Sequence, residues 1–246
     1  MIVTGGTKGI GAAIAHRFTR AGANVIVAAR SQGSEKDGGQ FVAADLTTAE
    51  GVSNLAERAL EILGGVDILI DNAGGQSYIP DGVLAMTDDA WNQDLNLNLM
   101  SAVRLDRALL PAMIAQGSGV IIHVTSGQAR LPGPASLPYA AAKAAATTYS
   151  KGLANEVGQY GIRVNTVVPG LIETPASSRR LQEVAHVAGT DLETIRQQQI
   201  RKLGVPLERT GLPDEVAALV AFLASDDAKY ITGSQYVIDG GLLPTV

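Results

Sequence analysis

The chain has 246 residues, 46% of them hydrophobic but only 4% aromatic, and its formal net charge is −5. Its length suits one large α/β domain with an aliphatic core, while the lack of basic runs and of cysteine excludes a nucleic-acid footprint, disulfides and thiolate metal sites. Neither a signal peptide nor an apolar run of membrane-spanning length is recognisable, so we expect a cytoplasmic protein that contacts no membrane.

Short apolar runs alternate with segments of helical periodicity along the chain. The runs predict buried strands at 2–3, 25–28, 41–43, 66–70, 120–124, 164–168 and 236–238. The periodic segments predict helices at 11–20, 48–63, 88–116, 139–160 and 214–225. This alternation is typical of a parallel sheet with helices on both faces. We therefore expect one domain, residues 1–246, with an α/β doubly wound sheet, the Rossmann fold.

Two stretches depart from this regular pattern. Residues 30–40 are polar and too few for a full crossover helix with its turns, so we expect that helix to be absent or reduced to a turn. Residues 175–209 form a long, mostly polar segment of helical character. Long insertions at strand ends commonly form lids, so we expect a substrate-binding lid here.

A glycine-rich motif, Thr4-Gly5-x3-Gly9-x-Gly11, follows the first predicted strand and opens the first helix. Gly5 permits a tight turn, Gly9 lets the backbone approach a pyrophosphate, and Gly11 allows close packing of helix on strand. The helix N-terminus then offers N–H groups and a positive dipole end to the phosphates. The motif predicts a dinucleotide site, and an ordinary glycine-rich turn is the alternative.

Polar and small residues also follow the third and fourth predicted strands. Asp45 can accept a hydrogen bond from an adenine amine, or it can cap the helix that begins near Thr48. Asn72 can tie neighbouring strands together through side-chain hydrogen bonds. Ala73 and Gly74 are small enough to leave room for a ribose, although a plain loop explains them equally well.

Tyr139 and Lys143 lie four residues apart in a predicted helix and so share one face. A free tyrosine, with a pKa of about 10, is a poor base at neutral pH, but a nearby ammonium group favours the phenolate. The pair predicts a general acid in reduction and a base in oxidation, with an ordinary surface pair as the alternative. Ser126 follows the strand predicted at 120–124, where its hydroxyl can bond a substrate oxygen or simply start a loop.

Asn98 lies in the middle of the helix predicted at 88–116, where asparagine is unfavourable. A kink that holds a water and relays protons to Lys143 gives it a reason to be there, and Asn96 is a competing candidate. We interpret His123, within a predicted strand, as a packed core residue. Because no group of His, Asp and Glu has metal-ligand spacing in the sequence, we expect no metal.

These residues, in this order, resemble the short-chain dehydrogenase/reductase family in its compact single-domain branch. The resemblance covers nearly the whole chain and continues through Arg163-Val164-Asn165 and Pro169-Gly170 to Asp239-Gly240-Gly241. Within it, the spacing from Trp91 selects Asn98 over Asn96. It implies an NAD(P)-dependent oxidoreductase and a homotetramer formed partly through the helices at 88–116 and 139–160. It also implies a catalytic tetrad of Asn98, Ser126, Tyr139 and Lys143.

The resemblance further implies a cofactor site at the carboxyl ends of the strands. It places Pro169 and Gly170 beside the nicotinamide, with Ile172 and Thr174 near its carboxamide. The expected cofactor-binding residues are Gly5, Thr7, Lys8, Gly9, Ile10, Gly11, Arg30, Asp45, Leu46, Asn72, Ala73, Gly74, Tyr139, Lys143, Pro169, Gly170, Ile172 and Thr174.

The residue that ends the second predicted strand bears on the choice of cofactor. An acid there binds the adenine ribose diol and repels a 2′-phosphate. This chain has Ala29 at that point, followed by Arg30, with Lys8 on the same side. Two cations and no acid favour NADP(H), with NAD(H) as a second cofactor; solvated surface charges are the alternative.

The sequence thus predicts an NADP-preferring oxidoreductase that moves a hydride between the nicotinamide and a carbonyl or secondary alcohol. Tyr139 is expected to act as its general acid or base. Its partners are expected to be the small-molecule substrate and further copies of the chain, with no nucleic acid. The alternatives are a non-catalytic nicotinamide-nucleotide-binding regulator and a same-fold epimerase or lyase.

Overall fold

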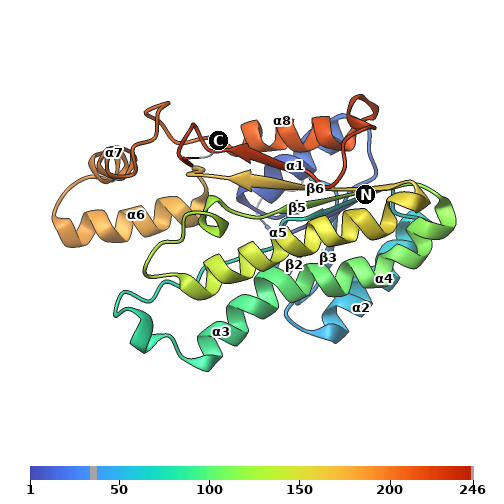
Figure 1. The fold of residues 1–246 in the computed structure, drawn as a ribbon, viewed down its shortest axis with the longest axis horizontal. Helices are drawn as coiled ribbons and strands as arrows, with labels where there is room; N and C mark the ends of the chain where they lie inside the picture. The colour runs from blue at the N-terminus through green and yellow to red at the C-terminus, as the bar shows by residue number, and fades with distance from the viewer. Residues whose placement is uncertain (34–37, 245–246) are drawn as a thin grey trace.

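A parallel β-sheet forms the centre of the computed structural model, which describes residues 1–33 and 38–244 (Figure 1). Its seven strands lie in the order β3-β2-β1-β4-β5-β6-β7. All the predicted strands are confirmed, with ends that differ by a residue or two. They are β1 (Ile2–Thr4), β2 (Ile26–Ala29), β3 (Gln40–Ala43), β4 (Ile68–Asp71), β5 (Gly119–Val124), β6 (Ile162–Pro169) and β7 (Gln235–Ile238). The inner strands are buried beneath the helices, whereas the edge strands β3 and β7 are partly exposed.

The order of the strands creates a reversal point at the middle of the sheet. β1 pairs with β2 on one side and with β4 on the other. The chain moves outward from β1 to β3, then crosses back and moves the other way from β4 to β7. In doubly wound sheets, ligands bind beyond the carboxyl ends of the strands at such a reversal. The fold alone therefore points to the loops that follow β1 and β4.

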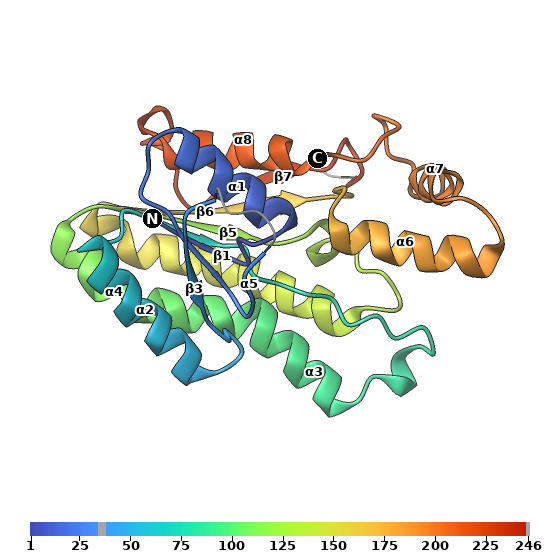
Figure 2. The same cartoon turned by 180° about the vertical axis from the view of Figure 1, so that it is seen from behind.

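Helices cover the sheet in two layers, with α1 and α8 on one face and α2, α4 and α5 on the other (Figures 1 and 2). The helices are α1 (Gly9–Arg20), α2 (Ala49–Leu63), α3 (Asp88–Leu95), α4 (Ser101–Gln116), α5 (Leu137–Val157), α6 (Pro175–Ala188), α7 (Leu192–Leu203) and α8 (Pro213–Ala224). Short 3-10 turns add Val83–Ala85, Gly127–Ala129, Gly158–Tyr160 and Asp226–Ala228, and a π-helical turn spans Asn96–Met100.

Each layer has its own aliphatic core, as the near absence of aromatic residues requires. On one face, Ile14 of α1 and Val216 of α8 pack onto Val3 and Ile70 of the central strands. On the other face, Leu105 and the rest of the buried side of α4 pack with α2 and α5 against the sheet. Both cores hold the central strands in place, so the strand ends that border the site are fixed from above and below.

The helix predicted at 88–116 is interrupted. Two α-helices, α3 and α4, are joined through the π-helical turn at Asn96–Met100, and Asn98 lies at the centre of that turn. Single π turns inside helices occur often at functional sites. The irregularity expected at Asn98 is therefore present as one widened turn, and the water expected to lie there stays a prediction.

The segment at 175–209 forms a pair of helices, α6 and α7, that project past the carboxyl ends of the strands (Figures 1 and 2). Thr174 caps α6, since its Oγ1 accepts from the N–H of Ser177 at 3.1 Å. Part of the short crossover at 30–40 lies outside the described residues, so the expected loss of its helix stays a prediction. No helix within 1–33 or 38–244 combines the length and apolar composition needed to cross a bilayer.

Candidate active site

Asn72, directly after β4, joins the two strand ends at the reversal point. Its Nδ2 donates to the backbone oxygens of Thr4 at 2.9 Å and Gly5 at 3.4 Å. The hydroxyl of Thr4 donates to Ile70 O at 3.2 Å and accepts from the N–H groups of Asn72 and Ala73, both at 3.0 Å. These bonds give Asn72 the strand-tying contacts expected from the sequence. They also fix the start of the glycine loop.

The glycine loop leaves the first turn of α1 open to an anion. Gly5 and Gly9 have φ angles of 62° and 58°, which residues with side chains rarely adopt. A Cβ on Gly11 would lie 2.3 Å from Gly5 O, so the loop can return this closely only onto glycine. Lys8, at the N-cap, gives the first turn no side-chain hydrogen bond within the described chain. The N–H groups and the positive end of the helix dipole therefore suit a phosphate.

Asn98 is buried and faces the loop after β4. Its Oδ1 accepts from Gly75 N at 3.1 Å, while its Nδ2 donates to Gly75 O at 2.8 Å and to Asp94 O at 3.0 Å. The competing candidate, Asn96, accepts instead from Arg104 Nη2 at 3.0 Å. The widened turn thus directs Asn98 toward the reversal point and holds it there through both atoms of its amide.

Tyr139 and Lys143 lie on one face of α5, which has a proline, Pro138, in its first turn. Lys143 Nζ donates to Val124 O at 2.9 Å and lies 6.0 Å from the centroid of the Tyr139 ring. A Cβ on Gly74 would lie 3.1 Å from Lys143 Nζ and 2.9 Å from Asn98 Oδ1. Lys143, Asn98 and the loop after β4 therefore border one small space.

Ser126 completes this arrangement from the end of β5. Its Oγ accepts from Gln128 N at 3.1 Å, which starts a 3-10 turn, and its hydroxyl forms a hydrogen bond with Tyr139. The structure thus brings together all members of the predicted tetrad. They come from three separate elements, the π-helical turn, the end of β5 and α5, so the fold is what places them side by side.

Burial governs the protonation of the Tyr139–Lys143 pair. Burial raises the pKa of the Tyr139 phenol above its ordinary value, and the hydrogen bond from Ser126 partly offsets this rise. Burial also lowers the pKa of Lys143 to about 8, against an opposing effect of the Asp71 carboxylate. Near neutral pH both side chains hold their protons, which is the state required to donate a proton to a carbonyl oxygen.

The residues expected near the nicotinamide lie around the start of α6. Gly170 follows β6, and its N–H donates to Ile238 O at 3.0 Å. Ile172 is buried and forms an isolated bridge with Gly211. A Cβ on Gly9 would lie 3.3 Å from the Thr174 side chain, so the start of α6 lies directly against the glycine loop.

The residues expected near the adenine lie on the other side of the glycine loop. Lys8 and Arg30 are both exposed. Asp45 Oδ1 accepts from the N–H and hydroxyl of Thr47 at 3.0 and 2.7 Å, and these bonds, with a smaller effect of Arg30, lower the pKa of Asp45. The cap of α2 is Thr48, whose hydroxyl accepts from Gly51 N. Asp45 therefore does not cap α2, which was the alternative for this residue in the sequence.

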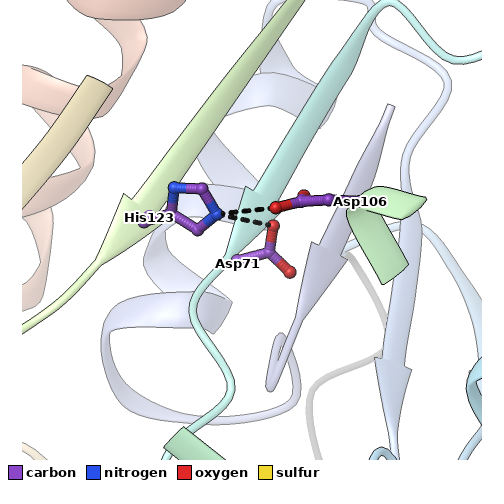
Figure 3. A group of neighbouring side chains, drawn as sticks. All are labelled: Asp71, Asp106 and His123. Atoms are coloured by element: carbon purple, nitrogen blue, oxygen red, sulfur yellow. Dashed lines mark hydrogen bonds and ion pairs between the residues drawn. The ribbon is translucent and has the colours of Figure 1, made fainter. Parts of the chain in front are cut away.

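A second polar group in the core was missed by the sequence reasoning. Asp71 ends β4, Asp106 lies on α4 and His123 lies on β5, and their side chains meet (Figure 3). His123 is buried as expected, yet it is hydrogen-bonded as well as packed, with Nε2 3.0 Å from Asp106 Oδ2. Ligand atoms of the three lie within 4.8 Å of one another, a grouping that the spacing argument against metal sites overlooked. The sequence signal that could have revealed this cluster is the presence of Asp71 at the end of an apolar strand and of Asp106 on the apolar face of a helix.

A family model described as "Enoyl-(Acyl carrier protein) reductase" matches residues 5–243. The chain belongs to the short-chain dehydrogenase/reductase family. It is similar to the 3-oxoacyl-(acyl-carrier-protein) reductase of Vibrio cholerae, with 36% identity over 98% of this chain and 96% of that protein. It is equally similar to dehydrogenase/reductase SDR family member 4 of Bos taurus, with 36% identity over 98% of this chain and 86% of the relative.

Solved structures agree with this membership of the short-chain dehydrogenase/reductase family. L-sorbose reductase from Gluconobacter frateurii, in complex with NADPH and L-sorbose, superposes with a TM-score of 0.93 and 37% identity, covering 100% of this chain and 96% of that one. Aldohexose dehydrogenase from Thermoplasma acidophilum gives a TM-score of 0.90 and 29% identity, covering 100% and 95%. The predicted family, the single Rossmann-like domain and the oxidoreductase class are therefore confirmed.

Proposed function

We propose that this family member is an NADP-preferring oxidoreductase that transfers a hydride between the nicotinamide and a carbonyl or secondary alcohol carbon. The observation that carries the proposal is the convergence of Tyr139, Ser126, Lys143 and Asn98 beside a glycine loop open to an anion. The NADPH and L-sorbose bound in the Gluconobacter enzyme support this choice of cofactor and of reacting group.

The residues at the reversal point fit a dinucleotide. The first turn of α1 offers its N–H groups to the pyrophosphate, and Gly74 leaves open the space next to Lys143. The Lys143 ammonium has three donors and uses one on Val124 O, so two remain for ribose hydroxyls. When bound, the nicotinamide gives or takes the hydride, and the chain supplies the rest of the chemistry.

In reduction, Ser126 and Tyr139 donate hydrogen bonds to the carbonyl oxygen of the substrate, and Tyr139 gives up its proton as the oxygen becomes a hydroxyl. The Lys143 ammonium stabilises the phenolate that remains. A cavity of about 10 Å³, enough for one water, borders both Lys143 and Asn98 and offers a path for proton return. Asn98 fixes this path by holding Gly75 through two hydrogen bonds.

Replacing Tyr139 by Phe tests the proposed chemistry. Turnover of NADPH with a 3-oxoacyl thioester or L-sorbose should fall by about 10² to 10⁴, while the NADPH dissociation constant, followed by fluorescence, stays within twofold. Tyr160→Phe is the matched control, because Tyr160 is exposed beyond the end of α5. Turnover retained in Tyr139→Phe would refute the assignment of Tyr139 as the proton donor.

The preference for NADP is tested by binding. At one fixed salt concentration, NADPH should bind more tightly than NADH, because Lys8 and Arg30 attract the 2′-phosphate. Lys8→Ala and Arg30→Ala should each weaken NADPH binding and leave NADH binding unchanged, whereas Arg58→Ala, an exposed cation on α2, should affect neither. Equal affinity for both cofactors would refute the preference while leaving the oxidoreductase assignment in place.

A further inference from the structure

A buried polar cluster lies beneath the tetrad, on the core side of Lys143. Asp71, Asp106 and His123 are each no more than 8% exposed. His123 Nε2 lies 3.0 Å from Asp106 Oδ2 and 3.7 Å from Asp71 Oδ2, and Nδ1 lies 3.0 Å from Ser150 Oγ (Figure 3). The imidazole thus links the Asp106 carboxyl through Nε2 and the Ser150 hydroxyl through Nδ1. Two strands and one helix, β4, β5 and α4, thus bring three titratable side chains to one point in the core.

Two carboxylates at this depth need a proton between them. Within residues 1–33 and 38–244, Asp71 Oδ2 and Asp106 Oδ1 are buried and lack a hydrogen-bond donor. Both carboxyls nevertheless turn one oxygen to His123 Nε2, Asp106 Oδ2 at 3.0 Å and Asp71 Oδ2 at 3.7 Å, and these atoms all lie within 4.8 Å of one another. Burial, reinforced by the charge of Asp106, holds the pKa of Asp71 well above its ordinary value. A single proton shared by the carboxyls supplies the missing donor and removes one of the two buried negative charges.

The cluster is coupled electrostatically to Lys143. The Asp71 carboxylate opposes the effect of burial on the pKa of Lys143. Asp71, His123 and Lys143 also line the same cavity of about 10 Å³. With one shared proton, the two carboxyls together carry a single negative charge, which balances the positive charge of the Lys143 ammonium. A change in the charge of Asp71 therefore changes the pKa of Lys143, whose ammonium stabilises the Tyr139 phenolate.

Other titratable groups near the cluster come from the helices packed on it. Tyr149 of α5 packs edge-on against His123 at 5.7 Å between ring centroids, and its pKa is raised by burial and by the nearby carboxylates of Asp106 and Asp71. Glu156 acts on Tyr149 from farther along α5. A neutral Tyr149 hydroxyl leaves the charge of the cluster unchanged.

We propose that Asp71 and Asp106 share one proton, that His123 holds Asp106 in place for it, and that this cluster is a positioning group that sets the charge of Lys143. The inference rests on the proposed function only in giving Lys143 a part in turnover. The residues beneath the tetrad then influence catalysis through the charge of Lys143, although they touch neither substrate nor cofactor.

Infrared spectroscopy of the purified full chain, without added ligand, tests the shared proton directly. At neutral pH the wild type should show the C=O stretch of a protonated carboxylic acid. Asp71→Asn should abolish this band, and Asp106→Asn should lower the pH at which it disappears. Asp227→Asn, at an exposed acid, is the control and should leave the band unchanged. A wild-type chain without the band, or one that carries a stoichiometric metal ion, would overturn the proposal without any variant having to fold.

The pH dependence of kcat for NADPH-dependent reduction tests the link to Lys143. Asp71→Asn leaves the remaining negative charge on the more distant Asp106, so the alkaline limb should move down by about one pH unit. Asp106→Asn concentrates the charge on Asp71, so the limb should move up. A purely structural role would lower kcat in both variants without opposite shifts, and that result would overturn the proposal. If the wild type reduces no carbonyl, the proposed function fails, and the infrared result still decides the shared proton.

Discussion

Replacing Gly74 by alanine should damage the active site while leaving the fold intact. The added Cβ would lie 2.9 Å from Asn98 Oδ1 and 3.1 Å from Lys143 Nζ. Ordinary contacts of this kind begin near 3.4 Å, so the two polar groups must move apart by several tenths of an ångström. Neither has much freedom, since Asn98 is bonded to Gly75 and Lys143 to Val124 O at 2.9 Å.

The expected cost follows from the sensitivity of catalysis to position. A displacement of about 1 Å at a reacting group can reduce the rate by about 10². A shift of about half that size should lower kcat by roughly 10-fold, which corresponds to about 1.4 kcal/mol in the activation free energy. Overpacking at the site should also reduce the free energy of unfolding by about 1 kcal/mol.

The neighbouring glycine provides a matched control. A Cβ on Gly75 would meet, among the described residues, only the terminal methyl of Leu97 at 3.1 Å, and that side chain can rotate away. The kcat of Gly75→Ala should therefore stay within about threefold of the wild type. The assay is NADPH oxidation with L-sorbose or a 3-oxoacyl thioester, together with thermal unfolding of both variants. Equal kcat values for Gly74→Ala and Gly75→Ala would refute the reasoning.

Three further predictions concern pH, strand pairing and capping. The rate of carbonyl reduction should fall as the pH rises through about 8, because Lys143 then loses the proton that it holds at lower pH; a flat profile from pH 7 to pH 9 would contradict this. Asn72→Ala removes both side-chain hydrogen bonds to the end of β1, so it should lower the free energy of unfolding by about 1–3 kcal/mol in denaturant unfolding. It should also weaken NADPH binding measured by fluorescence. An unchanged affinity would show that the glycine loop keeps its conformation without these bonds. Glu215, which accepts from Leu212 N at 2.7 Å and pairs with Arg209, has its pKa lowered to about 2, so Glu215→Ala should reduce the free energy of unfolding by about 1 kcal/mol at neutral pH. This loss should shrink as the pH falls from 4.5 towards 2, since the wild-type carboxylate is then protonated, whereas Glu183→Ala, at an exposed acid on α6, should show no such pH dependence in its melting temperature.

The fold was predictable because each strand and most helices carry their own local pattern. Apolar runs flanked by helical periodicity have few solutions other than a doubly wound sheet. The interruption at Asn96–Met100 was only partly predictable: an asparagine in mid-helix indicated a defect, but the choice of a π turn depends on the contact of Asn98 with Gly75, which is distant in sequence.

The candidate site, too, was only partly predictable from the sequence. The candidate tetrad could be selected from the sequence because its residues stand in a recognisable order, and the structure brings them together, while their catalytic roles stay a prediction. The cluster of Asp71 and Asp106 could not be identified from the sequence. Each aspartate stands alone among apolar residues there, and only the fold brings the two together beside His123. Association into a tetramer also stays a prediction, since it depends on surfaces between copies of the chain.

The π-helical turn described above also constrains how this region can change during evolution. A π turn holds one residue more than the α-helical turn that it replaces. Deleting one residue between Asn96 and Met100 would restore a regular helix and would change the rotation of α4 relative to α3 only slightly, because the wide turn absorbs the extra residue. The buried face of α4, which carries both Leu105 and Asp106, would therefore stay against the sheet. The deletion would instead remove the widened turn that directs Asn98 to Gly75, so we expect single-residue deletions here to keep the core but to lose the contact of Asn98 with the loop after β4.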